Sequence, residues 1–125
     1  RIETLAEQLR SIGVRSSIFL DPDNQQVELA AKTGVDRIEL YTERYANAYA
    51  KDDFEAVLPL YQDAAKQATQ LGLGVNAGHD LDLDNLPDFL TIPYILEVSI
   101  GHALTVDALD MGLEKAIHAY LEVLC

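Results

Sequence analysis

Short segments typical of β-strands alternate with segments typical of α-helices along this whole sequence, and this alternation limits the possible folds more than any other feature. The predicted strands are rich in Val, Ile, Leu and aromatic residues and cover residues 14–20, 35–41, 73–77 and 95–100. Helical patterns cover residues 1–13, 21–32, 52–71, 84–90 and 102–125. Such repeats favour a parallel sheet with right-handed crossovers, so the sequence predicts an α/β fold.

Glycines and capping residues mark the expected helix ends. Gly13, Gly34 and Gly72 each follow a helical segment, where glycine commonly acts as a C-terminal cap. Asp21 and Pro22 predict an N-cap and a first-turn proline for the second helix. The first helix has no capping residue before its first turn, so we expect it to begin before residue 1.

Two connections stand out in this pattern. Residues 42–51 are predicted to be a loop, longer than the roughly 2–6 residues usual between a strand and a helix, and loops of this kind often carry function. The final helix is predicted to be continuous, because apolar residues recur at helical spacing from Val106 to Leu121. His118, midway along it, is expected on the surface.

Polar residues share one facing of the predicted strands, which separates two parallel α/β architectures. Alternation places the polar set opposite an apolar set of Leu40, Val75, Val98 and Ile100; the polar set is Glu39, Asn76, Glu97 and Ser99. A doubly wound sheet buries both faces in apolar contacts, whereas a (β/α)₈ barrel turns one face to its interior. Because a complete barrel takes roughly 250 residues, we interpret residues 1–125 as a single partial domain, about half of such a barrel.

Composition narrows the classes of partner and compartment. The chain of 125 residues is 49% apolar and carries a formal charge of −12, which disfavours nucleic acid because phosphate backbones are bound through clustered Lys and Arg. No apolar stretch approaches the roughly 18 residues of a membrane span, and the one cysteine, Cys125, allows no internal disulfide. We expect a cytoplasmic protein. Small anionic substrates stay possible, since helix N-termini bind anions locally.

Two similar phrases place a glycine and a histidine at predicted strand ends. Gly78 and His79 follow the third strand, and Gly101 and His102 follow the fourth. Histidine side chains titrate close to neutral pH, so His79 is a candidate acid, although a structural role in the loop is an alternative. Gly101 and His102 precede a helix, where barrels often bind phosphate; the alternative is a tight turn that His102 caps.

The polar strand residues have a simpler interpretation as well. From the residues alone, Glu39 is expected to pair with Arg37 or Arg15, because charges inside barrels are usually paired. Glu97 and Asn76 are expected to form a hydrogen-bonded network. The sequence has no HxxxH pair, GxxxxGK[ST] loop or GxGxxG phrase, so neither a metal nor a nucleotide held by those devices is predicted.

Three phrases, at residues 37–42, 74–81 and 97–104, resemble the pyridoxine 5′-phosphate synthase family. The resemblance covers nearly the whole chain and corresponds to strands five to eight, the carboxy-terminal half of that family's TIM barrel. It implies condensation of 1-deoxy-D-xylulose 5-phosphate with 3-amino-2-oxopropyl phosphate to form pyridoxine 5′-phosphate, phosphate and water, without a metal or organic cofactor. It also implies a homo-oligomer, an octamer in the family.

The resemblance assigns roles residue by residue. His79 would be the proton donor, and Glu39 would stabilise cationic intermediates. Asp80, Gly101 and His102 would hold the amino-ketone phosphate, with Asp80 using its backbone because some family members have glycine there. The family's second catalytic histidine, its glutamate base and most pentulose-binding residues lie on earlier strands, so residues 1–125 alone are expected to be inactive.

Two alternatives remain at this stage. One is a non-catalytic half-barrel that associates with another copy through its open strand edges. The other is a different barrel enzyme that acts on a sugar phosphate, since the same phosphate-binding loops after the last two strands would bind such a substrate.

Overall fold

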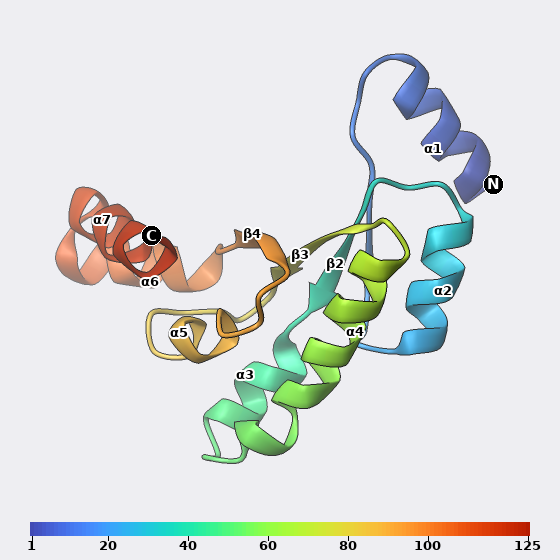
Figure 1. The fold of residues 1–125 in the computed structure, drawn as a ribbon. Coiled ribbons are helices and arrows are strands. Elements are labelled where there is room, and N and C mark those ends of the chain that lie inside the picture. The colour runs from blue at the N-terminus through green and yellow to red at the C-terminus, as the bar shows by residue number, and fades with distance from the viewer.

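A computed structural model describes residues 1–125 and has the predicted α/β architecture. Four parallel strands form one sheet in the order β1-β2-β3-β4: β1 Ser17–Leu20, β2 Arg37–Tyr41, β3 Gly74–Gly78 and β4 Ile95–Ser99. The helices between and around them are α1 Ile2–Ser11, α2 Asn24–Lys32, α3 Glu43–Tyr49, α4 Leu58–Gln70, α5 Leu86–Phe89, α6 His102–Met111 and α7 Leu113–Leu124, with a 3₁₀ turn η1 at Phe54–Ala56. Figure 1 shows the N-terminal helix and the α6–α7 pair at opposite ends of the molecule.

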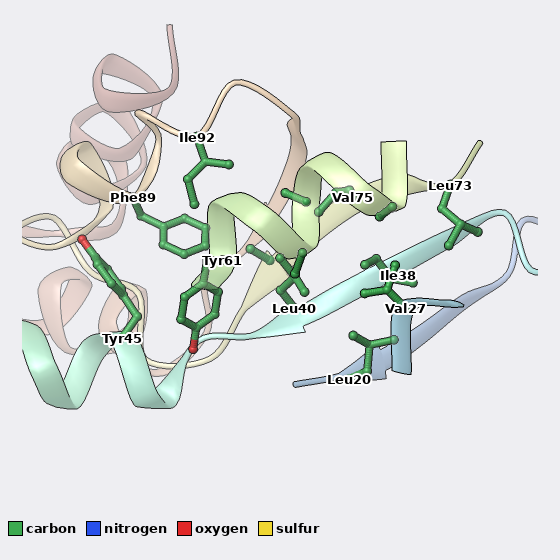
Figure 2. Close-up of a cluster of buried hydrophobic side chains, with 14 of the residues drawn as sticks. Leu20, Val27, Ile38, Leu40, Tyr45, Tyr61, Leu73, Val75, Phe89 and Ile92 are labelled. Atoms are coloured by element: carbon green, nitrogen blue, oxygen red, sulfur yellow. The ribbon is translucent and has the colours of Figure 1, made fainter. Parts of the chain in front are cut away.

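The core lies between one face of the sheet and helices α2 and α4. Ile38 and Leu40 on β2 and Val75 on β3 are fully buried there, as strand alternation predicts. Figure 2 shows these side chains gathered beneath α4, and Tyr61 beside Phe89 toward the end of the sheet where the strands finish. The rings of Tyr61 and Phe89 meet edge to face. The opposite face of the sheet carries the polar residues.

Several predicted boundaries are wrong by one or a few residues. The first strand begins at Ser17 rather than Val14, because the N–H of Ser16 bonds to the side chain of Asp36. The N-cap of α2 is Asp23 and not Asp21, since its carboxylate accepts from the N–H groups of Gln25 and Gln26. The second strand begins two residues later than predicted, at Arg37, and β3 and β4 match their predicted ranges to within one residue.

The predicted loop at residues 42–51 is largely a helix. Residues Glu43–Tyr49 form α3, whose Tyr45 is fully buried against Phe54, Tyr61 and Phe89. This short helix owes its stability to tertiary packing of one aromatic side chain, because seven residues are too few for a stable isolated helix.

Two predicted helices are divided. The helix expected from residue 52 is a 3₁₀ turn followed by α4, which begins with Pro59 in its first turn. The final helix breaks at Gly112, whose φ of 91° is outside the helical region, so α6 and α7 are separate. His118 on α7 is exposed, as predicted. The longest helix, α4, has 13 residues, and none combines the length and apolar character needed to cross a bilayer.

Candidate active site

Parallel pairing lines up the predicted polar residues in one row across the sheet. Glu39 on β2 pairs with Asn76 on β3, which pairs in turn with Glu97 on β4. Phe19 on β1 completes the row beside Glu39. The shared facing predicted from alternation is therefore confirmed. Asn76 is buried, Glu39 is half-buried and Glu97 is exposed.

Glu97 forms ion pairs with both of the arginines on this face, Arg15 and Arg37. Its carboxylate is 3.0 Å from Arg15 and 3.0 Å from Arg37, and Asn76 accepts from Arg37 at 2.8 Å and donates to Glu97 at 3.2 Å. Arg37 reaches across β3 because Gly74 lies between: a β-carbon there would stand 2.9 Å from Cγ of Arg37. The predicted network of Glu97 and Asn76 is confirmed, with the arginines added to it.

Glu39 makes no hydrogen bond and no ion pair, so the prediction that it pairs with Arg37 or Arg15 is wrong. Its carboxylate lies over Gly78 on the next strand, where an added β-carbon would be 2.5 Å from Oε1. Gly78 is buried, and the absence of a side chain there makes room for the carboxylate. The row thus holds one neutralised glutamate and one free glutamate.

His79 follows directly after Gly78 at the carboxyl end of β3. Its φ is 95° and that of Asp80 is 56°, so two consecutive non-glycine residues adopt left-handed backbone. Nδ1 of His79 is 3.0 Å from Oδ2 of Asp80, and the imidazole packs edge-on against Tyr41 with ring centroids 4.6 Å apart. Nδ1 is therefore held by a carboxylate, and Nε2 is left without a partner.

Tyr41 ends β2 and forms one wall of this position. Its hydroxyl donates to the carboxylate of Glu43 at 2.5 Å, and that hydrogen bond raises the pKa of Tyr41 to about 12. The phenol is therefore neutral at physiological pH and committed to Glu43. Tyr41 contributes a fixed ring edge against His79 rather than a free acid.

The predicted phosphate residues lie at the same edge of the sheet as His79. Gly78 pairs with Ser99, so the chain after Ser99 leaves the sheet beside the His79 turn. Gly101 is the N-cap residue of α6 and His102 is its first residue, both exposed. His102 lines an open cleft together with three acidic residues, Asp82, Asp84 and Asp107. An anion at this edge would meet the backbone N–H groups of α6 more favourably than this acidic cleft.

Three residues of the site were not singled out from the sequence for this role: Tyr41, Thr42 and Asn85. Thr42 and Asn85 are buried and bond to the backbone of the turn at residues 78–80. A buried threonine directly after a strand was the available signal, because such a hydroxyl needs a hydrogen-bond partner. No three His, Cys, Asp or Glu side chains gather closely enough to hold a metal ion.

The fold and this edge define an α/β protein in which parallel strands present polar residues at their carboxyl ends, the arrangement on which barrel enzymes build active sites. The model of the family described as "Pyridoxal phosphate biosynthesis protein PdxJ" matches residues 1–125. The chain belongs to this family.

Individual relatives are consistent with that assignment. The chain is 57% identical over 121 residues to a pyridoxine 5′-phosphate synthase of Porphyromonas gingivalis, covering 96% of this chain and 50% of the relative. It is 53% identical over 123 residues to that of Christiangramia forsetii, covering 98% and 51%, and 46% identical over 125 residues to that of Xanthomonas oryzae, covering 99% and 49%. The chain spans about half the length of the relatives it matches.

Proposed function

We propose that residues 1–125 form strands five to eight of a (β/α)₈ barrel, the carboxy-terminal half of a pyridoxine 5′-phosphate synthase. Support comes from the family membership, the half-length coverage and the sequential order of the four parallel strands. The polar row of Glu39, Asn76 and Glu97 would face the barrel interior, with α2 and α4 outside. The active site would then lie at the edge where β2, β3 and β4 end.

The proposed reaction is the condensation of 1-deoxy-D-xylulose 5-phosphate with 3-amino-2-oxopropyl phosphate into pyridoxine 5′-phosphate, with loss of inorganic phosphate and water. This makes the intact protein a transferase-type synthase of vitamin B6 biosynthesis. We further propose a cytoplasmic homo-oligomer that acts on these small phosphorylated substrates. The half described here would supply the acid and the phosphate grip, and the other half would supply the base.

The free carboxylate of Glu39 is the observation that carries this proposal. Condensing an amine with a ketone passes through cationic iminium species, and a fixed carboxylate stabilises such charge where water is excluded. An ion pair with Arg15 or Arg37 would neutralise a carboxylate used in this way, but both arginines are paired with Glu97. Glu39 therefore keeps its charge available for the substrate.

His79 suits the role of proton donor to a departing hydroxyl or phosphate oxygen. With Nδ1 held by Asp80, Nε2 is the atom that exchanges the proton. The imidazole cannot swing freely, because the ring of Tyr41 lies against it. The ring is thus held in one orientation, and Nε2 is the nitrogen that would donate the proton.

The amino-ketone phosphate is proposed to bind across the ends of β3 and β4. The N–H groups in the first turn of α6, beginning at His102, have no partner within the helix and carry the positive end of its dipole. The backbone of Asp80 and Gly101 would complete the grip. In this arrangement the phosphate that leaves as inorganic phosphate would lie next to His79.

Turnover by a full-length protein carrying this sequence tests the proposal. Formation of pyridoxine 5′-phosphate and inorganic phosphate is followed with both substrates, comparing wild type with His79→Asn and with His118→Asn as an exposed control on α7. We expect His79→Asn to lose most of the activity while His118→Asn keeps it. Ring closure at the wild-type rate by His79→Asn would refute the proton-donor role.

A second candidate rests on the open edges of the sheet. β1 and β4 each pair on one side only, and large apolar side chains such as Leu109 and Leu113 are exposed. A half-barrel with these features could associate with another copy and carry no catalysis. Sedimentation of residues 1–125 together with the ring-closure assay separates the candidates: turnover by this fragment alone would contradict the need for the other half.

A further inference from the structure

The turn that carries His79 is held by hydrogen bonds from two buried residues, Thr42 and Asn85. Three successive carbonyl groups accept: Gly78 from the N–H of Thr42 at 3.0 Å, His79 from Oγ1 of Thr42 at 2.5 Å, and Asp80 from Nδ2 of Asn85 at 3.0 Å. His79 and Asp80 are the two consecutive left-handed residues of the site. A left-handed conformation at a non-glycine residue persists only where surrounding contacts stabilise it. These three hydrogen bonds stabilise it here.

Thr42 is itself rigidly placed. It is fully buried at the junction between β2 and α3, and its carbonyl accepts from the N–H of Ala46 in the first turn of α3. The aromatic packing of Tyr45 holds that helix against the body of the protein. The hydroxyl that supports His79 is therefore supported by the core.

Asn85 is held with comparable precision from the other side of the turn. Its Oδ1 accepts from the N–H of Asp82 at 3.0 Å, its N–H donates to the carboxylate of Asp82 at 2.8 Å, and its carbonyl accepts from the hydroxyl of Tyr45 at 2.7 Å. Asn85 is 3% exposed. Tyr45 thus links both supports, since it lies in α3 and bonds to Asn85.

We propose that Thr42 and Asn85 are positioning residues that set the orientation of the His79 imidazole through the backbone of its turn. This inference rests on the proposed function, in which His79 is the proton donor. Neither side chain touches the imidazole or replaces its chemistry. Without the Thr42 hydroxyl, the turn relaxes toward ordinary negative φ and carries the ring away from Tyr41, while the phosphate grip on α6 stays in place.

Loss of the Thr42 hydroxyl and loss of the Asn85 amide are expected to change different kinetic constants. Thr42 bonds to the carbonyl of His79, so its loss lowers kcat; a misplacement of about 1 Å costs on the order of 100-fold in rate. Asn85 bonds to the carbonyl of Asp80, which is proposed to contact the phosphate, so its loss also raises KM for the amino-ketone phosphate. A purely structural role would lower thermal stability without producing this division.

The test uses four variants of a full-length protein carrying this sequence. Thr42→Val removes the hydroxyl at constant shape, and Thr42→Ser keeps it; Asn85→Ser shortens the second support. Thr69→Val is the matched control, because Thr69 makes the same kind of hydroxyl-to-carbonyl bond to Ala65 in α4, far from the turn. We expect kcat to fall about 10-fold or more in Thr42→Val, with KM within about threefold, and to recover in Thr42→Ser.

A second readout does not depend on turnover. The ¹H and ¹⁵N shifts of the His79 imidazole report its position beside Tyr41, and they should move in Thr42→Val but not in Thr69→Val. Folded Thr42→Val with unchanged His79 shifts and a kcat within twofold of wild type would overturn the inference. If Thr42→Val does not fold, Thr42→Ala compared with Thr42→Ser decides, and equal rates in those two would overturn it. Absence of turnover in wild type would refute the proposed function instead, and the imidazole shifts would then decide the positioning role.

Discussion

The carboxylate of Glu39 lies over the α-carbon of Gly78 on the neighbouring strand, so closely that a β-carbon at residue 78 would be 2.5 Å from Oε1. The two residues are two positions out of register and so share a face of the sheet, since Glu39 pairs with Asn76 and Gly78 pairs with Tyr41. Gly78 therefore serves the glutamate as well as the turn: it leaves the space that the unpaired carboxylate of Glu39 occupies, and it directly precedes His79 in the chain.

Replacing Gly78 by Ala should displace this carboxylate. The added methyl group would overlap Oε1 of Glu39 and press against the side chain of Ser99, so we expect the free energy of unfolding to fall by about 1–3 kcal/mol. Urea denaturation of Gly78→Ala, Glu39→Ala and the double variant measures the coupling. The cost of Gly78→Ala should be smaller in the Glu39→Ala background; equal costs would show that the two residues do not compete for space.

Asp36 should make stability depend on acidic pH. The backbone N–H and then the hydroxyl of Ser16 bond to its carboxylate and hold the pKa of Asp36 below its ordinary value of 3.8. A lowered folded-state pKa contributes stability that is present above 3.8 and is lost as the pH falls through the folded-state value. We expect Asp36→Asn to lower Tm at pH 7 and to approach wild type as the solution becomes more acidic. Asp110→Asn, which removes no hydrogen bond, is the control; a Tm difference for Asp36→Asn that is constant with pH would contradict this account.

Tyr61 should make the stability of the protein depend on alkaline pH. Burial raises its pKa to about 12 from 10.0, so the stability linked to its neutral form is complete below pH 10.0 and is lost as the pH rises toward 12. Its hydroxyl donates to the carbonyl of Tyr41 at 2.8 Å, so Tyr61→Phe should cost about 1 kcal/mol at neutral pH. That deficit should shrink above pH 10.0, measured by denaturation across pH with Tyr94→Phe as control. A deficit that grows with pH would refute the assignment.

The sheet and its polar row could be predicted from the sequence because both depend on local patterns. Alternation along β2 and β4 places Glu39 and Glu97 on one face regardless of what surrounds them. The partner of Arg37 could not be predicted in this way. It depends on β3 lying between β2 and β4, and on Gly74 leaving the path to Glu97 open.

Helix α3 was missed for a related reason. Its seven residues have too weak a local preference, and what stabilises them is the burial of Tyr45 among aromatic residues distant in the sequence. Missing α3 meant missing the place of Thr42, which begins it. The candidate residues His79 and Glu39 could be found from motifs, but the groups that position them are defined only by the folded chain.

We propose that the unpaired carboxylate of Glu39 stabilises a cationic intermediate, and Glu39→Gln is the sharpest probe of this role because it removes the charge and keeps the shape. The measurement is kcat for ring closure by a full-length protein at saturating concentrations of both substrates, with Tm recorded alongside. We predict that kcat falls about 100-fold or more while Tm stays within a few degrees of wild type. A kcat within twofold of wild type in the folded variant would show that the charge of Glu39 does not stabilise the intermediate.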